Sequence, residues 1–169
     1  MTCASSDRSH FPQPPALGCV YKLVEINGKP TIKLSQNVEK RTMPGKKIAR
    51  RIFVGGEAVV DLLQTAQETP PEVGKYFICR HPVEHHTQEQ VKPCKIEDLH
   101  KCYWSDGQVS TNLPSLKEIR QHVKESLKTL PSCHKRSLNP TPYKVYVSED
   151  LYDLNANLLK ENQPIGRLE

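Results

Sequence analysis

Proline is the feature that most restricts the fold of this chain. Fourteen prolines in 169 residues are about twice the usual share of ~5%. Proline lacks the backbone N–H and interrupts helices and central strands, so long uninterrupted helices are disfavoured. The longest apolar stretches run only a few residues, far short of the ~20 that a membrane helix needs. The sequence therefore predicts one soluble intracellular domain, with no membrane partner, built from short strands and short helices.

Two glycine turns indicate where the chain forms hairpins. The pair Asn27-Gly28 separates the β-branched and aromatic run 20–26 from the alternating run 29–34, a strong signal for a type I′ hairpin. The pair Gly55-Gly56 separates a strand over 48–54 from a return strand over 58–63. We expect edge strands at 29–34 and at 58–63.

The middle of the chain predicts smaller elements. We expect a strand over 76–79, a loop over 83–95 that includes a strand around Val91, and a further strand over 108–110. A short helix is predicted over 95–103, because Ile96, Leu99 and Tyr103 lie three and four positions apart.

Two helices are predicted in the last third. Ser115 and Glu118 form a capping box; the apolar residues that follow at helical spacing are Leu116, Ile119, Val123, Leu127 and Leu130, and Pro131 ends this helix. A strand follows over 143–147, and Ser148 caps a second helix that ends before Pro164 and Gly166. The predicted fold class is α+β: antiparallel β-hairpins followed by two helices flanking a strand.

The ends of the chain and its cysteines indicate its organisation. Residues 1–16 have no periodicity and no apolar core of a signal peptide, which predicts a disordered lead-in before one domain over 17–169. The six cysteines are Cys3, Cys19, Cys79, Cys94, Cys102 and Cys133. They are too scattered for a secreted disulfide scaffold, so we predict reduced thiols.

The sequence offers little that resembles a catalytic or metal centre. Cysteines and histidines gather between Cys79 and Cys102, but no Cys-x-x-Cys pair is present, and a polar surface describes them better than a zinc site. Serine nucleophile motifs, the phosphate-binding P-loop and the dinucleotide fingerprint are absent. We therefore predict no metal site and no catalytic residue in this chain.

A basic segment is the better candidate for binding an anion. Six cations and no acid lie in the twelve residues from 40 to 51, and Pro44-Gly45 offers a flexible turn that could present them to phosphates. The phosphate-contact candidates are Lys40, Arg41, Lys46 and Lys47. The alternative is a solvated loop followed by a strand, since successive strand residues point to opposite faces. Nucleic acid is disfavoured as a partner, because the interleaved aromatics of single-strand binders are missing.

Several blocks of the sequence resemble one known family. These are 17–30 (LGCVYKLVEINGKP), 33–35 (KLS), Lys40, 44–47 (PGKK), 113–120 (LPSLKEIR) and 134–145 (HKRSLNPTPYKV). In this order they resemble the C-terminal part of the animal nicotinate phosphoribosyltransferases, over about residues 13–169. Residues 4–12 match nothing in that family.

The resemblance implies a function in NAD salvage in the cytosol. Members of the family make nicotinate mononucleotide from nicotinate and phosphoribosyl pyrophosphate, coupled to hydrolysis of ATP with Mg²⁺. Their catalytic residues lie in an α/β barrel on which the C-terminal domain packs, and that barrel is not in this chain. The resemblance thus implies no cofactor site here, a partner in a homodimer or in full-length subunits, and a fragment or short isoform that is inactive alone. The alternative is a non-catalytic interaction or anion-binding module that pairs with full-length subunits.

Overall fold

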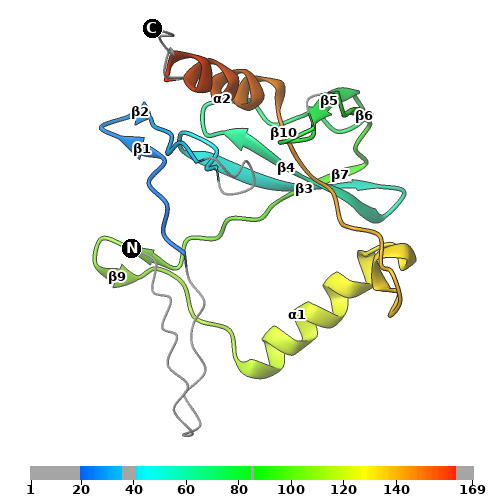
Figure 1. Cartoon of the computed structure of the whole chain (residues 1–169). Coiled ribbons are helices and arrows are strands. Elements are labelled where there is room, and N and C mark those ends of the chain that lie inside the picture. The colour runs from blue at the N-terminus through cyan, green and yellow to red at the C-terminus, as the bar shows by residue number, and fades with distance from the viewer. Residues whose placement is uncertain (1–19, 36–40, 85, 163–169) are drawn as a thin grey trace, which may run out of the picture.

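A curled six-stranded sheet forms the centre of the computed structural model, which describes residues 20–35, 41–84 and 86–162. The strand order is β6-β5-β10-β4-β3-β7. The bounds of these strands are β3 Lys47–Val54, β4 Glu57–Thr65, β5 Phe77–Arg80, β6 Gln88–Val91, β7 Lys95–Asp98 and β10 Val145–Val147. The outer strands β6 and β7 follow each other in the chain, so the sheet curls to bring its two ends towards one another (Figure 1).

Glycine turns connect the hairpins as the sequence predicts. Strands β3 and β4 pair antiparallel through Gly55 and Gly56, both at positive φ. The short strands β1 (Glu25–Ile26) and β2 (Lys29–Pro30) pair through Asn27 and Gly28, at φ 49° and 75°. Only glycine and small polar residues adopt this conformation readily, which is why a type I′ turn is readable in advance. The first hairpin is much shorter than the predicted runs 20–26 and 29–34.

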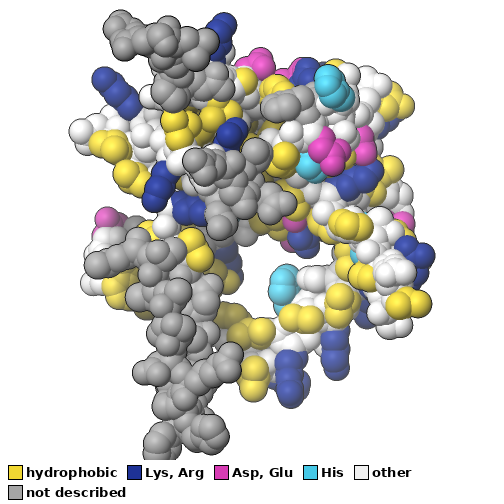
Figure 2. Space-filling model, viewed as in Figure 1, with side chains coloured by type: hydrophobic (Ala, Val, Ile, Leu, Met, Phe, Trp, Pro, Cys, Tyr) yellow, Lys and Arg dark blue, Asp and Glu magenta, His cyan; other side chains and the backbone are white. Residues whose placement is uncertain are grey.

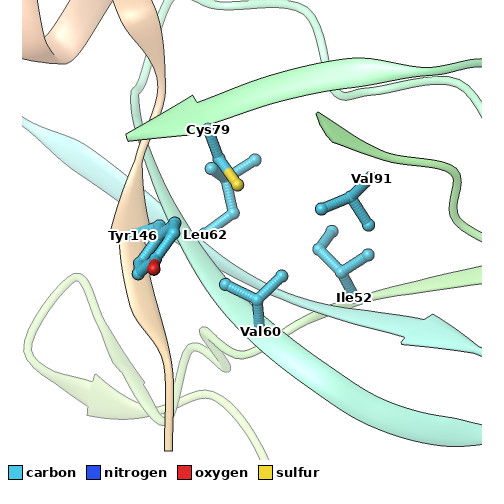
Figure 3. Close-up of a cluster of buried hydrophobic side chains, with 6 residues drawn as sticks. All are labelled: Ile52, Val60, Leu62, Cys79, Val91 and Tyr146. Carbon is cyan, nitrogen blue, oxygen red and sulfur yellow. The ribbon is translucent and has the colours of Figure 1, made fainter. Parts of the chain in front are cut away.

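The core lies inside the curl of the sheet. Six buried side chains from five strands point towards one another there (Figure 3): Ile52, Val60, Leu62, Cys79, Val91 and Tyr146. Alternate residues of β4 are buried, as a strand with one face on a core requires. The core therefore comes from side chains that the sequence spreads over nearly one hundred positions.

Two expectations about strands are wrong. Residues 95–98 form strand β7 and no helix, because Ile96 lies opposite Ile52 of β3 and adds to the core. The return strand β4 is central and no edge, because β10 pairs with it in parallel, with Val145 opposite Asp61. A parallel partner 84 positions away leaves no local trace in the sequence.

The remaining elements lie around the sheet. Strands β8 (Trp104–Ser105) and β9 (Gln108–Val109) form a further small hairpin. Helix α1 spans Leu116–Thr129, a 3₁₀ turn spans Ser132–Lys135, and helix α2 spans Glu149–Glu161. Ser148 caps helix α2, as predicted, and its Oγ accepts from Leu151 N; the helix packs on β4 and β5. The predicted lead-in 1–16 lies outside the described residues.

Candidate interaction surface

Helix α1 stands apart from the body of the domain. Its N-terminus has the predicted capping box: Ser115 Oγ accepts from Glu118 N, and the Glu118 carboxylate accepts from Ser115 N at 2.7 Å. This arrangement lowers the pKa of Glu118. No residue of α1 is buried. A well-capped helix without a fully buried residue depends mainly on local interactions for its stability, and fourteen residues are marginal for that in water.

The apolar stripe of α1 is exposed. The side chains of Leu116, Ile119, Val123 and Leu127 are 68, 46, 49 and 48% accessible. They lie three to four positions apart, so they share one face of the helix. The stripe is sequence-encoded, as predicted, but the elements that the structure describes do not cover it.

A basic face runs beside the apolar stripe. Lys117, Arg120, Lys124 and Lys128 are exposed and also recur at three to four positions. Figure 2 shows Lys and Arg side chains gathered on the side of the helix that faces away from the sheet. Of the two glutamates of α1, Glu118 belongs to the capping box, and Glu125 accepts from Gln121 Nε2 at 2.7 Å. The helix thus presents an apolar stripe with a basic flank.

A hollow of about 690 Å³ separates α1 from the sheet (Figure 2). Arg51, Phe53 and Lys95 line it from the sheet, and His122, Glu125 and Ser126 line it from α1. The polar side of α1 therefore faces the sheet, and of the apolar stripe only Ile119 lines the hollow. In its position relative to the described part of the domain, α1 leaves most of its own stripe unburied.

The sheet wall of the hollow is held by paired charges. Arg51 donates two hydrogen bonds of 2.8 Å to the Asp61 carboxylate, and Tyr143 Oη donates to the same carboxylate at 3.1 Å. Burial, with the nearby Asp61 charge, raises the pKa of Tyr143 to about 12, and the hydrogen bonds to Asp61 raise the pKa of Arg51. This cluster ties the segment that leads back from α1 to strands β3 and β4. Sequence reasoning missed it, because Tyr143 is 82 positions from Asp61.

A second polar network lies inside the sheet. Arg50 is almost fully buried; its Nε lies 2.8 Å from Asp98 Oδ1, and its guanidinium donates to Gln64 Oε1 at 2.8 Å. Gln64 Nε2 donates a hydrogen bond to the Glu68 carboxylate, and the same carboxylate accepts from Ser148 Oγ at 2.8 Å. The network joins β7, β3 and β4 to the start of α2. Arg50 is therefore a structural residue rather than an exposed cation.

The four phosphate-contact candidates do not form one cluster. Lys40 lies outside the described residues. Arg41 Nε donates to the carbonyl of Ser35, and Lys46 is exposed. Lys47 turns inwards, where its ammonium donates to the carbonyls of Met43, Pro44 and Gly45, and burial lowers its pKa.

The turn that was expected to present these cations is not a flexible surface loop. Pro44 and Gly45 are buried, and Gly45 N donates to Val24 O at 2.7 Å. Gly45 has φ +75°, a left-handed conformation that glycine adopts without strain, while a Cβ there would meet Pro30 at an ordinary contact distance of 3.6 Å. Phosphate contact by these residues stays a prediction.

His85 lies outside the described residues; the other histidines and the cysteines between 79 and 102 form no metal-binding group. Among the described residues, no three His, Cys, Asp or Glu side chains are placed to hold a metal ion. His81 Nδ1 accepts from the backbone of Val83 and Glu84, which gives this ring a role in its own turn. Within the part of the chain that the structure describes, no side chain of serine, threonine or cysteine hydrogen-bonds to a histidine ring. A search of the described helices for a span long and apolar enough to cross a membrane finds none.

The thiols differ in exposure. The four cysteines in the described part are free, as predicted; Cys79 is buried, and Cys94 and Cys102 are exposed. Burial raises the pKa of Cys79 to about 11, and the nearby Glu89 charge adds to the shift. The neutral thiol is thus favoured by folding, so its contribution to stability is complete below the unfolded pKa of ~8.5 and is lost as the pH rises through about 11.

We expect Cys79 to resist a thiol reagent in the native protein at pH 8, because the thiolate is the reactive form. Cys94 and Cys102 are the internal controls and should react at once. Peptide mapping after labelling, with and without denaturant, measures this. Labelling of Cys79 as fast as Cys94 in the native state would contradict the buried position.

Comparisons with known proteins agree with the resemblance noted from the sequence. A family model described as the nicotinate phosphoribosyltransferase C-terminal domain matches residues 45–155. The nicotinate phosphoribosyltransferase of Caenorhabditis elegans is 51% identical over 157 residues, which are 92% of this chain and 28% of that protein. The Homo sapiens enzyme is 38% identical over 156 residues, covering 90% of this chain and 28% of its own length.

A solved structure is similar as well. The crystal structure of human nicotinic acid phosphoribosyltransferase matches with a TM-score of 0.72 and 35% identity, over 85% of this chain and 27% of that one. The chain therefore spans little more than a quarter of the length of these relatives.

Proposed function

The chain belongs to the nicotinate phosphoribosyltransferase family, as its C-terminal domain, and from this we propose that it serves in the synthesis of nicotinate mononucleotide for NAD salvage. The reaction joins nicotinate to the phosphoribosyl group of phosphoribosyl pyrophosphate, coupled to ATP. The observation that carries the proposal is the similarity over 92% of the chain to an enzyme of which it spans 28%.

Within that enzyme, we assign this domain a structural role rather than a chemical one. The described residues contain no nucleophile hydrogen-bonded to a histidine and no group able to hold a metal ion, so we assign the Mg²⁺ that accompanies ATP to no residue of this chain. The exposed stripe of α1 suits a domain that packs on a larger body. We further propose that the enzyme is cytosolic and that it works as a homodimer.

The alternative, a non-catalytic interaction or anion-binding module that pairs with full-length subunits, is less well supported. The comparisons give one enzyme family over nearly the whole chain. Three cations of the basic segment, Lys47, Arg50 and Arg51, make internal contacts in the fold.

We expect the purified chain alone to form no nicotinate mononucleotide above a blank without protein. Loss of a single oxyanion-hole donor already costs an enzyme ~10²–10³ in rate, and here the nicotinate and phosphoribosyl sites would all be missing. The measurement is product formation from nicotinate, phosphoribosyl pyrophosphate and MgATP, in a preparation free of host enzyme. Turnover that co-purifies with the chain would refute the assigned role.

A chimaera tests the role itself. The part of this chain that matches the Caenorhabditis elegans enzyme, 92% of the chain at 51% identity, would replace the corresponding segment of that enzyme. We expect the chimaera to be soluble and to make nicotinate mononucleotide, whereas the same enzyme without the segment should not. A folded but inactive chimaera would contradict the proposal.

A further inference from the structure

The turn of the first hairpin combines a reactive sequence with an open conformation. Asn27 and Gly28 are both exposed, at φ 49° and 75°. No described atom outside the chain neighbours of Gly28 lies within 4 Å of where its Cβ would be. Asn27 is also the one asparagine of the sequence that a glycine follows. Because glycine has no side chain, its backbone nitrogen can approach the neighbouring carboxamide without steric hindrance.

Only a short ladder holds this turn closed. Strands β1 and β2 form two residue pairs, and Figure 1 shows their turn pointing away from the sheet. Hairpins with so few pairs are marginal in water, so this turn opens far more readily than the core of the domain. Opening frees the ψ angle of Asn27, which must rotate before the Gly28 nitrogen can reach the side-chain carboxamide.

We propose that Asn27 is a site of spontaneous deamidation, at which the backbone nitrogen of Gly28 displaces ammonia from the Asn27 side chain. A bond forms between the Gly28 nitrogen and Asn27 Cγ, the bond from Cγ to Nδ2 breaks, and the proton of the Gly28 nitrogen leaves with the ammonia. One water molecule then opens the resulting succinimide ring at either carbonyl. The products are aspartate and isoaspartate. The reaction is independent of the proposed synthesis of nicotinate mononucleotide.

The isoaspartate product weakens the contacts behind the turn. Its main chain is longer by one methylene, which a two-residue type I′ turn does not accommodate. Val24 O, three positions before Asn27, accepts from Gly45 N at 2.7 Å. Glu25 Oε2 accepts from Lys46 N at 2.9 Å. Because Gly45 is buried, release of the hairpin opens a buried part of the domain to water.

The molecule contains two internal controls for the backbone geometry. Among the described residues, three that are not glycine have a positive φ: Asn27, Asp106 and Asn139. Asn139 is exposed at φ 47°, but Pro140 follows it, and a proline nitrogen carries no proton to lose. Asp106 precedes Gly107 at φ 51°, but its carboxylate is a weaker electrophile than a carboxamide. If a positive φ were sufficient, all three sites would change, whereas the proposed chemistry selects Asn27.

Incubation of the full 169-residue chain at pH 8 and 37 °C, followed by peptide mapping with mass spectrometry, measures the reaction. We expect Asn27 to convert from amide to acid at least ~10-fold faster than any other asparagine, since the others precede residues that carry side chains. One added carboxylate lowers the formal net charge from +5 to +4, which ion-exchange chromatography resolves. An intact Asn27 in the native chain, after a time in which it converts in urea, would overturn the proposal. Conversion of Asn139 at the same rate as Asn27 would overturn it as well.

Two substitutions separate the chemistry from its structural effect. Asn27→Gly keeps a sequence that favours a type I′ turn but removes the carboxamide, so the fast loss of positive charge should disappear. Loss of charge in this variant at the rate of the unchanged chain would place the reaction elsewhere. Freshly prepared Asn27→Asp adds the same charge without lengthening the main chain.

Hydrogen exchange of the Gly45 amide measures the release of the hairpin. We expect exchange about 2- to 10-fold faster in the isoaspartate fraction than in Asn27→Gly or Asn27→Asp, which is the effect of one lost hydrogen bond. Equal exchange rates in all three would show that the modified turn stays attached, and would overturn the structural consequence. Fast exchange in Asn27→Asp as well would assign the release to the added charge rather than to the longer main chain, and would overturn the proposed cause.

Discussion

Replacement of Leu62 by alanine is expected to lower the free energy of unfolding by about 3–5 kcal/mol. Leu62 is 1% exposed and lies at the centre of the core, between β3 and β10 (Figure 3). The substitution removes buried apolar surface and leaves a cavity that close-packed neighbours fill only in part. Because domains of this size are stable by about 5–15 kcal/mol in total, the variant should be close to unfolding at 37 °C.

Leu116→Ala provides the matched control. It makes the same chemical change at the first residue of α1, where the side chain is mostly exposed, so we expect a change within about 0.5 kcal/mol. Urea unfolding of the isolated chain, followed by circular dichroism, measures both. Equal losses for the two variants would mean that the core does not lie where the structure places it.

Replacement of Arg50 by alanine is expected to give the second large loss in the free energy of unfolding. Arg50→Ala should cost about 2–4 kcal/mol, because it leaves Gln64 Oε1 without its donor in a buried site and breaks the pair with Asp98. The expected loss lies below that of a fully buried ion pair, because the Asp98 side chain is 65% exposed and water can solvate its carboxylate.

Two further variants separate charge from packing. Arg50→Met keeps the apolar stem, so we expect a smaller loss than for alanine. Arg120→Ala, on the exposed face of α1, should be nearly neutral in the isolated chain. The measurement is again urea unfolding. A loss for Arg50→Ala no larger than that for Arg120→Ala would show that the buried network adds nothing to stability.

The elements that the sequence predicted well are those whose signal is local. The Asn27-Gly28 and Gly55-Gly56 turns, the capping box of Ser115 and Glu118, and the cap at Ser148 all depend on residues within four positions. The steric and hydrogen-bonding requirements of a turn or a cap are met inside that window. The family was readable for another reason, because several sequence blocks kept their order over most of the chain.

The sequence misled where a short apolar pattern fitted two structures. Ile96, Leu99 and Tyr103 have helical spacing, but four residues are enough for an edge strand, and the open side of β3 supplied the partner. The basic segment 40–51 shows that cations close in sequence need not share one environment. Its cations are close in sequence, yet Lys47, Arg50 and Arg51 point to three different environments, since a buried turn and two strand faces separate them.

The sequence by itself determined the turns, the helix caps and the apolar stripe of α1, because each is encoded by neighbours along the chain. Only the tertiary structure decided that β10 enters the sheet beside β4, that Arg50 is buried, and that the stripe of α1 finds no cover within the described residues. These outcomes depend on partners tens of positions away. The chain gains the free energy of burial only after it has closed those long loops. An amphipathic helix has the same pattern whether it packs on its own sheet or on another surface, and in this structure α1 lies beyond the hollow with its stripe uncovered by the described elements.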